Sequence, residues 1–322
     1  MAGIALLFLS TLAWANDADP GAPVPDTDEA GMEVVMVVGV QPGPGLWKVT
    51  SGEHFMWILG EISPSARRVE WKSGRFENLL RNSQELLLDF SGYWSANHSE
   101  TRQLAYAELL PSGVTLKDVI GPELHDRVES LARRFDAPRM EDMHPFAVTN
   151  HLAVSAMDSL DLKSFSARFA AQQLARKVHV KVTRFAVPEI PFPERLRNWQ
   201  DASNAICLQR LVATIGDGGS GVRRLANAWS VGDISALRQL VPSYSFSRDG
   251  FRADECAAAM HGGEKQAREY KLRRTRAWLK EAKRVLRTNE STMAVVLMSE
   301  LFASDGYLAA LRAEGFEISE PQ

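Results

Sequence analysis

A chain of 322 residues with 45% hydrophobic residues is long enough to bury a full core, which excludes a wholly disordered protein. Its 37 Lys and Arg residues against 40 Asp and Glu residues give a net charge of -3, so no global positive field attracts nucleic acid or an anionic membrane surface. We therefore expect any partner to be recognised locally, and we expect no nucleic acid among the partners.

The first 15 residues have the outline of a secretory signal peptide. An apolar run from Ile4 to Phe8 continues to Trp14, and residues 13–15 have the small-x-small pattern of a cleavage site. No Lys or Arg precedes the run, which leaves a misassigned start as the alternative. The run is too short to span a bilayer, and no Cys follows it to carry a lipid. We expect an exported protein, periplasmic or secreted, without a stable membrane span.

The next residues predict a leader and then a β-rich start of the fold. Residues 16–31 are acidic and Pro-rich, which is typical of a disordered leader. The β-branched residues 32–40 predict a strand, and residues 46–60 predict a hairpin of two strands around Ser51-Gly52. A helix over residues 71–83 and a strand over residues 84–90 follow.

The middle of the chain has the apolar spacing of helices. Helical spacing extends from about residue 100 to 176, with Pro and Gly residues as punctuation. Residues 177–187 alternate and predict a strand. Residues 195–281 are mostly helical, with loops near Gly216 and Tyr244.

The C-terminal residues return to strand patterns. Ser291–Met298 predicts a buried strand, Asp305–Gly315 a helix that stops at glycine, and residues 316–319 a last strand. Strands at both ends with helices between them predict one α/β (α+β) domain over residues 32–322. Its central mixed sheet is built from N- and C-terminal strands, with a large helical insertion at about residues 100–285.

The glycine-rich motif GDGGSG places Gly216, Gly218 and Gly221 in the spacing of a dinucleotide fingerprint. That fingerprint requires a strand before it and an acidic residue about 20 positions later. The preceding residues have helical spacing, and no acid lies near position 241. A loop between helices is the better interpretation.

Most histidines have no companion at ligand spacing. His144 and His151 lie seven residues apart on a predicted helix, which separates them by roughly 10 Å, too far to share one metal. We see no ligand-spaced companion for the others either, which are His54, His98, His125, His179 and His261. The basic stretch Lys271–Arg287 keeps a helical apolar stripe, so we interpret its charges as a solvated face, with a polyanion-binding patch as the alternative.

The two cysteines, Cys207 and Cys256, are separated by 49 positions. In an oxidising envelope compartment, such a pair closes a disulfide worth roughly 4 kcal/mol by the loop-entropy model. Two buried free thiols are the alternative. Neither cysteine belongs to a C-x-x-C motif, so we expect no stoichiometric zinc.

Several segments, in this order, resemble the TraB/GumN family (TraB/PrgY/GumN-like) over Gly45 to Ile318. They are GLWKVTSGEHFMWILGEISPSARRVEWKS, LLLD, LPSGVTLKDVIGPELHDRV, ANAWSVGDISALRQL and MAVVLMSELFASDGYLAALRAEGFEI. The resemblance implies a relationship to metal-dependent hydrolases, including Tiki-type metalloproteases and erythromycin-esterase-like folds. Their sites use two G-x-x-H motifs and acidic residues.

Both histidine positions of that family pattern are altered in this chain. The first motif falls on Gly60–Ser63, so Ser63 takes the histidine position and follows Glu61. The second falls on residues 297–300, where Glu300 takes the histidine position. An acidic residue that closes a family strand is present as Asp89. If they are relics of metal positions, we expect Ser63 and Glu300 to lie close together at the carboxyl ends of neighbouring strands.

The loss of both imidazoles leads to two hypotheses about function. Glu61, Ser63, Asp89 and Glu300 offer only oxygen atoms, so we expect no cofactor beyond weak binding of a hard cation such as Ca²⁺ or Mg²⁺. The first hypothesis is a non-catalytic envelope protein that binds a peptide or protein. The second is a divergent, peptidase-like hydrolase with a carboxylate-lined cation or a carboxylate base. The family's E-R-N triplet falls on residues 273–275, where this chain keeps only the arginine, Arg274. If Arg274 caps the carboxylates, the second hypothesis fails.

Overall fold

The computed structural model describes residues 43–66, 74–89, 108–163, 166–185, 205–244, 256, 258 and 261–321. All of them belong to one of the chain's two compact units, Val40–Gln322. The expected signal peptide at residues 1–15, the leader at residues 16–31 and the strand at residues 32–40 lie outside the described residues.

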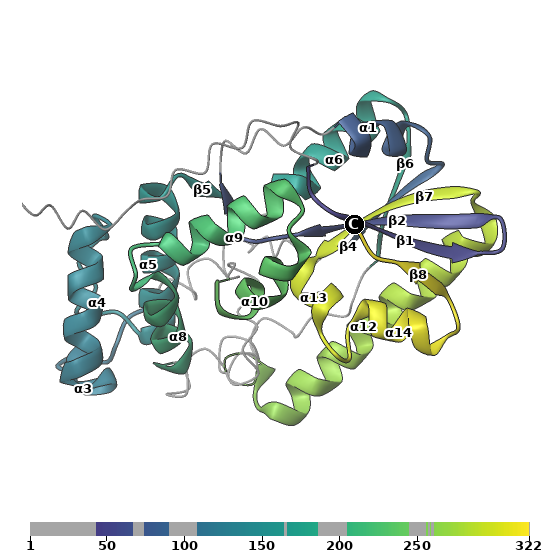
Figure 1. The fold of residues 1–322 in the computed structure, drawn as a ribbon. Coiled ribbons are helices and arrows are strands. Elements are labelled where there is room, and N and C mark those ends of the chain that lie inside the picture. The colour runs from purple at the N-terminus through teal and green to yellow at the C-terminus, as the bar shows by residue number, and fades with distance from the viewer. Residues whose placement is uncertain are drawn as a thin grey trace, which may run out of the picture. The chain divides into compact units, whose positions relative to one another are not determined.

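A six-stranded mixed sheet organises the described residues (Figure 1). Its order is β6 (Lys181–Phe185), β4 (Glu85–Asp89), β7 (Ser291–Leu297), β2 (His54–Glu61), β1 (Leu46–Ser51) and β8 (Glu317–Ser319). β2, β4, β6 and β7 run parallel, whereas β1 is antiparallel to both of its neighbours. The C-terminal strand β7 lies between two N-terminal strands, so the predicted fold class is confirmed.

The central strand β7 shows why these residues form this sheet. Every residue from Ser291 to Leu297 is buried, because helices cover both faces of a parallel sheet and a continuous apolar run suits that place. The hairpin of β1 and β2 instead alternates, with Trp47, Val49, Met56 and Ile58 buried. The predicted hairpin and buried strand are therefore confirmed.

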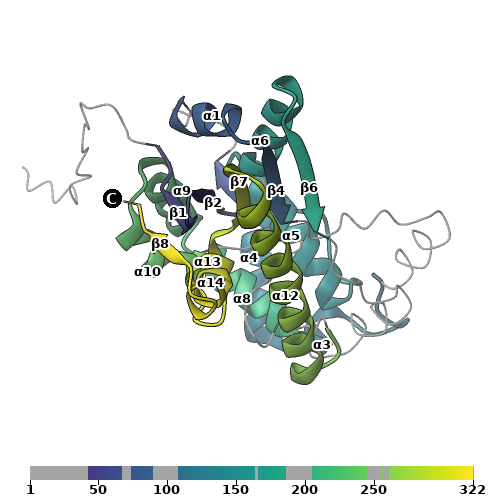
Figure 2. The same cartoon turned by 90° about the vertical axis from the view of Figure 1, so that its right-hand side faces the viewer.

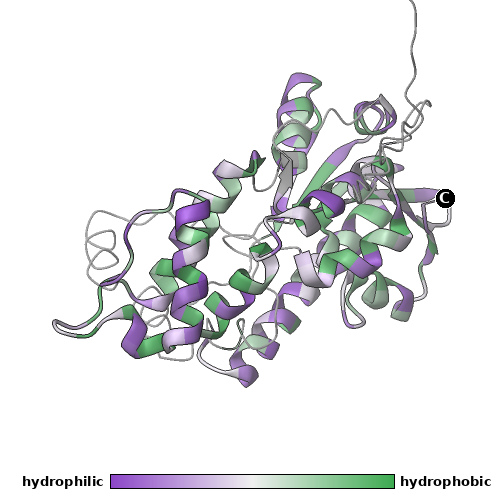
Figure 3. Ribbon diagram, turned by 60° about the vertical axis from the view of Figure 1, so that its left-hand side comes forward, coloured by the Kyte–Doolittle hydropathy of each residue, from purple (hydrophilic) through white to green (hydrophobic). Residues whose placement is uncertain are grey.

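Helices cover both faces of the sheet (Figure 2). α1 (Gly74–Arg81) and α6 (Ser166–Lys177) pack on one face, and the long α12 (Glu264–Thr288) crosses the strands on the other, beside α14 (Tyr307–Ala313). α12 buries Trp278, whose ring stacks on Tyr307 with centroids 4.2 Å apart. The helices carry both hydrophilic and hydrophobic residues, as expected of elements with one face on a core (Figure 3).

A second buried cluster is built mainly from helices. It gathers apolar residues of α3 (Leu116–Ile120), α4 (Pro122–Arg134), α5 (Pro145–Ser159) and α8 (Ala205–Ile215). The short pair of β3 (Ser65–Ala66) and β5 (Leu162–Lys163) links this cluster to the chain that follows β2. We call it the helical cluster.

Other elements of the predicted insertion belong to the sheet's own core. α9 (Ser220–Val231) and α10 (Ile234–Tyr244) contribute Trp229 and Leu237 to that core, and β6 is a strand of the sheet itself. The middle segment is therefore shared between two cores. The single-domain boundary at residues 32–322 stays a prediction.

Local differences from the sequence-based expectations have local causes. The strand expected from residue 177 begins at Lys181, because α6 continues to Lys177 and His179 turns the chain with a φ of 60°. His144 does not lie inside the helix with His151. It is the N-cap of α5, and its Nδ1 accepts a hydrogen bond from the Phe146 backbone N–H at 3.3 Å.

The glycine-rich loop joins α8 to α9, as predicted. The Asp217 carboxylate accepts hydrogen bonds from the backbone N–H groups of Gly219 and Gly221, at 2.9 and 2.8 Å. Burial raises the pKa of Asp217, but hydrogen bonds from Ser220 and these N–H groups outweigh it and lower the pKa. The start of α9 thus holds the chain's own carboxylate where a dinucleotide-binding helix would hold phosphate.

The predicted disulfide is present. Cys207 of α8 bonds to Cys256 with Cα atoms 5.0 Å apart, and both residues are buried. The bond ties the helical cluster to the chain that leads into α12. Among the residues that the structure describes, no helix combines the length and hydropathy needed to cross a membrane.

Candidate functional site

Three neighbouring parallel strands place the four residues predicted as a site. Glu61 and Asp89 end their strands, and Ser63 and Glu300 lie two and three residues beyond theirs. β2 pairs with β7 so that Glu61 lies opposite Leu297, and Glu300 follows three residues later in α13 (Met298–Phe302). Asp89 is the last residue of β4, on the other side of β7. Both altered motifs therefore end neighbouring strands, as expected, while the closeness of Ser63 to Glu300 stays a prediction. We call these four residues the carboxyl-end site, since ligands of open α/β sheets bind outside this end of the strands.

Glu61 is held by the first turn of α6. Its side chain is 1% exposed, and its Oε1 accepts a hydrogen bond from the Arg168 backbone N–H at 2.8 Å. The Arg168 guanidinium Nη2 lies 3.2 Å from the other carboxylate oxygen, Oε2. A carboxylate at a helix N-terminus satisfies an N–H group that has no partner within the helix, and the local dipole favours its charge. Glu61 therefore joins β2 to α6 through both the backbone and the side chain of Arg168.

Glu300 makes a second buried ion pair with a different helix. Its side chain is 2% exposed, and its Oε1 lies 3.2 Å from Nη1 of Arg274 on α12. Arg274 is itself mostly buried, with 11% of its side chain exposed. The capping of a site carboxylate by Arg274 is thus observed.

The other two members of the carboxyl-end site are placed by their backbone. Ser63 is buried two residues beyond the end of β2, and a cis peptide bond joins it to Pro64. Asp89 pairs with Phe185 of β6. Arg168, the partner of Glu61, was not predicted from the sequence. The two residues are separated by 107 positions, and the helix of Arg168 carries no local signal of the contact.

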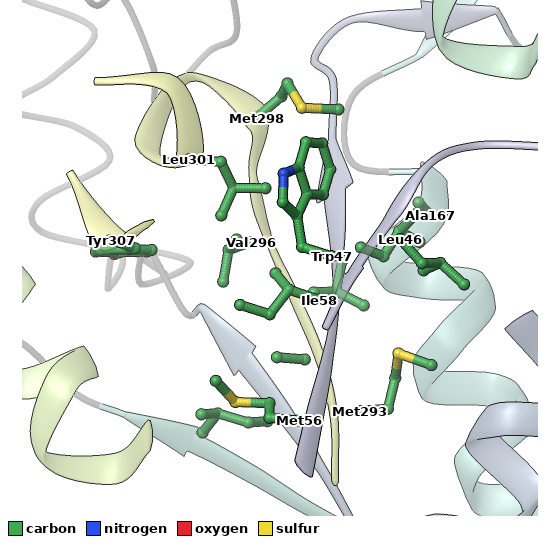
Figure 4. Packing of buried hydrophobic residues seen from close by; sticks show 14 of the residues in the cluster. Leu46, Trp47, Met56, Ile58, Ala167, Met293, Val296, Met298, Leu301 and Tyr307 are labelled. Carbon is green, nitrogen blue, oxygen red and sulfur yellow. The ribbon is translucent and has the colours of Figure 1, made fainter. Parts of the chain in front are cut away.

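The glycine of the first motif has a packing reason to be glycine. A Cβ on Gly60 would lie 2.5 Å from Sδ of Met298 and 2.9 Å from a methyl group of Leu301. Figure 4 shows Met298 and Leu301 close to the ring of Trp47. The Gly60 carbonyl also accepts a hydrogen bond from the indole N–H of Trp229 at 2.6 Å. α13 therefore packs directly on the end of β2 through the apolar side chains of Met298 and Leu301.

A separate carboxylate network lies at the opposite, amino end of the strands. Glu85 starts β4 and is 2% exposed. Its Oε2 accepts hydrogen bonds from Arg284, Asn289 and Lys181, at 3.2, 3.2 and 3.4 Å. Burial raises the pKa of Glu85, but hydrogen bonds from Arg284, Thr183 and Asn289 outweigh it and hold the pKa at about 2. This network fastens α12 to the sheet, far along the strands from the carboxyl-end site.

Comparison with known proteins assigns the fold. The model of the TraB/PrgY/gumN family matches residues 45–320. The chain belongs to this family. In the other two comparisons, no curated protein and no solved structure matches it. The TraB/PrgY/gumN match begins one residue before β1 and ends one residue after β8, so it includes the complete sheet and both cores.

Proposed function

We propose that this TraB/PrgY/gumN-family protein is a non-catalytic binding protein of the cell envelope. One observation carries the proposal: the two glutamates of the carboxyl-end site are each in a buried ion pair, Glu61 with Arg168 and Glu300 with Arg274. Each carboxylate has a guanidinium nitrogen of the protein 3.2 Å from one of its oxygens.

The metal that the family resemblance implies does not fit these residues. A divalent cation needs ligand oxygens with available lone pairs, and here a guanidinium nitrogen lies 3.2 Å from an oxygen of each glutamate. A cation between them would be repelled by two fixed positive charges in a poorly solvated place. The hydroxyl of Ser63 is too weak a ligand to compensate for that repulsion.

The same ion pairs argue against the alternative of a divergent hydrolase with a carboxylate base. A general base must come within hydrogen-bond reach of the proton that it removes. Glu61 is 1% exposed and Glu300 is 2% exposed, and both lie beneath helices that supply their guanidinium partners. A substrate would have to displace α6 or α12 to reach them.

Two features support an envelope location. The Cys207–Cys256 disulfide suits an oxidising compartment, and the apolar first 15 residues have the outline of an export signal. The partner class that we propose is a peptide or protein of the envelope.

The first test measures hydrolysis. Purified protein is incubated with fluorogenic peptide and ester panels, with and without Mn²⁺, Co²⁺ and Zn²⁺, beside the Glu61→Gln/Glu300→Gln variant. We expect the same background rate from both proteins. Turnover by the native protein that the double variant lacks would establish the hydrolase and overturn the proposal.

The second test measures binding. A photoreactive amino acid replaces Phe169, which is 46% exposed in the first turn of α6, next to Arg168. The matched control carries it at Leu272 of α12, which is 52% exposed. We expect a discrete envelope adduct from position 169 in living cells and none from position 272. No adduct at position 169, or equal adducts at both positions, would contradict binding at the carboxyl-end site.

A further inference from the structure

Three potential metal ligands converge in the helical cluster, away from the carboxyl-end site. His125 and Glu129 lie four residues apart on α4, and therefore on one face of that helix. Glu141 comes from the segment between α4 and α5. One ligand atom from each of the three residues lies within 4.8 Å of the other two, and the His125 Nε2 lies 2.8 Å from the Glu141 Oε2.

We propose that His125, Glu129 and Glu141 form a binding site for a divalent transition metal of the zinc class. An imidazole selects such metals over Mg²⁺, and two carboxylates neutralise the charge of the ion. Ligand atoms around a tetrahedral ion lie about 3.3 Å apart when the bonds are about 2.0–2.1 Å long. The present arrangement reaches that geometry by a small opening of the His125–Glu141 contact and an inward rotation of Glu129. Glu129 is free to rotate because 37% of its side chain is exposed.

The backbone fixes Glu141 opposite α4. The Glu141 carbonyl accepts a hydrogen bond from Leu116 N–H at 2.7 Å, and the neighbouring Asp142 carbonyl accepts one from Leu110 N–H at 2.8 Å. Met140 on the other side is buried. A ligand on a segment tied down at both sides loses little conformational entropy when a metal binds.

The charges around the site favour a cation. Asp126 Oδ1 lies 3.7 Å from Nδ1 of His125, a buried atom without a hydrogen-bond partner; the Asp126 side chain is 79% exposed, so water screens its charge as it does that of Arg133. Once Nε2 binds a metal, the protonated Nδ1 faces a carboxylate, which is the common outer contact of a metal-binding histidine. The Arg133 guanidinium lies 3.6 Å from Glu129, but its side chain is 72% exposed, so water screens its charge.

The proposal departs from two expectations drawn from the sequence, that His125 has no ligand-spaced companion and that the protein holds no stoichiometric zinc. The companion on α4 is a glutamate at the fourth position, and not a histidine or cysteine. The third ligand is contributed by chain folding, since 16 residues separate His125 from Glu141. A metal here joins α4 to the chain preceding α5. The proposal is independent of whether the carboxyl-end site is catalytic.

The experiment uses the full disulfide-bonded chain after removal of metals with EDTA. Calorimetric titration with ZnCl₂ is expected to give one site per chain with a micromolar Kd, and titration with MgCl₂ to give no heat of binding. The Co²⁺-loaded protein is expected to show visible absorption bands of nitrogen and oxygen ligation. Zinc is also expected to raise the melting temperature of the native protein.

Variants separate this site from adventitious binding. His125→Gln and, independently, Glu141→Gln are expected to weaken zinc binding at least ~10-fold, with circular dichroism used to verify folding. The matched control is His151→Gln on α5, which is expected to bind like the native chain. Absence of zinc binding by the native protein, or native affinity in both ligand variants, would show that His125 and Glu141 form only a hydrogen bond.

Discussion

Buried ion pairs at the residue scale have a measurable signature. We predict that Arg274→Met lowers the free energy of unfolding by about 3 kcal/mol, because it leaves the Glu300 carboxylate buried beside an apolar side chain. The matched control is Arg268→Met on the same helix, whose partner Glu264 is 78% exposed, and its effect is expected to stay below about 0.5 kcal/mol. Urea denaturation measures both. Adding Glu300→Gln to Arg274→Met is expected to recover most of the loss, and equal stability of the two single variants would refute the buried pair.

The carboxylate of Glu85 predicts a defined pH dependence. Its pKa falls from 4.5 to about 2 in the folded protein, although burial alone raises it, because hydrogen bonds led by that from Arg284 favour the charged form. A lowered folded-state pKa gives stability that is complete above the unfolded value of 4.5 and is lost as the pH falls toward 2. We predict that native protein exceeds Glu85→Gln in stability at pH 6, by at most about 3 kcal/mol, and that the gap shrinks between pH 4.5 and 2. Urea midpoints at pH 6, 4 and 3 measure the gap. A gap that stays constant with pH would contradict hydrogen bonding to the charged carboxylate as the source of this stability.

At the scale of elements, the turn between α13 and α14 holds Glu300 in place. A Cβ on Gly306 would lie 2.0 Å from the backbone oxygen of Glu300, and a backbone atom cannot rotate away as a side chain can. We predict that Gly306→Ala destabilises the protein by about 2 kcal/mol through overpacking. Gly74→Ala in α1 is the control, since a Cβ there meets nothing within 4 Å, and it is expected to be neutral or slightly stabilising. Thermal unfolding of both variants tests the comparison, and similar melting temperatures would count against it.

Elements were predictable where their signal is local. The hairpin alternates over neighbouring residues, and β7 is one continuous apolar run, so each could be predicted from its own residues. The start of β6 was misplaced because His179 adopts a positive φ, which apolar periodicity does not report. The Glu61–Arg168 pair was not predictable, because the contact exists only after α6 packs on the sheet.

For the molecule as a whole, the fold class and the neighbouring positions of β2 and β7 could be predicted from the sequence, whereas the charge balance of the site could not. Family resemblance implied that both altered motifs end neighbouring strands, and the β2–β7 register confirms this. Whether the carboxylates are available to a ligand depends on two helices from distant parts of the chain. α6 and α12 bring one arginine each, and only the assembled fold shows that these neutralise the two glutamates.

That charge balance leads to a last prediction about the carboxyl-end site. In a His125→Gln background, which removes the other proposed metal site, Ser63→His with Glu300→His places two imidazoles where the family pattern has histidines. We predict that this protein still binds Zn²⁺ weakly, because Arg274 then keeps its charge without Glu300, 3.2 Å from where that carboxylate stood.

Adding Arg274→Met removes the repelling guanidinium and is expected to increase Zn²⁺ affinity at least ~10-fold. The two introduced imidazoles and the carboxylate of Asp89 would then suffice for a zinc site. Calorimetry on both proteins measures the difference, with Arg268→Met in place of Arg274→Met as the control for losing a charge from α12. Equal affinity with and without Arg274 would show that its ion pair does not keep metals out. Absence of binding in every variant would show that residues 63 and 300 do not lie close enough to share an ion, and the alignment with the family's histidines would fail with it.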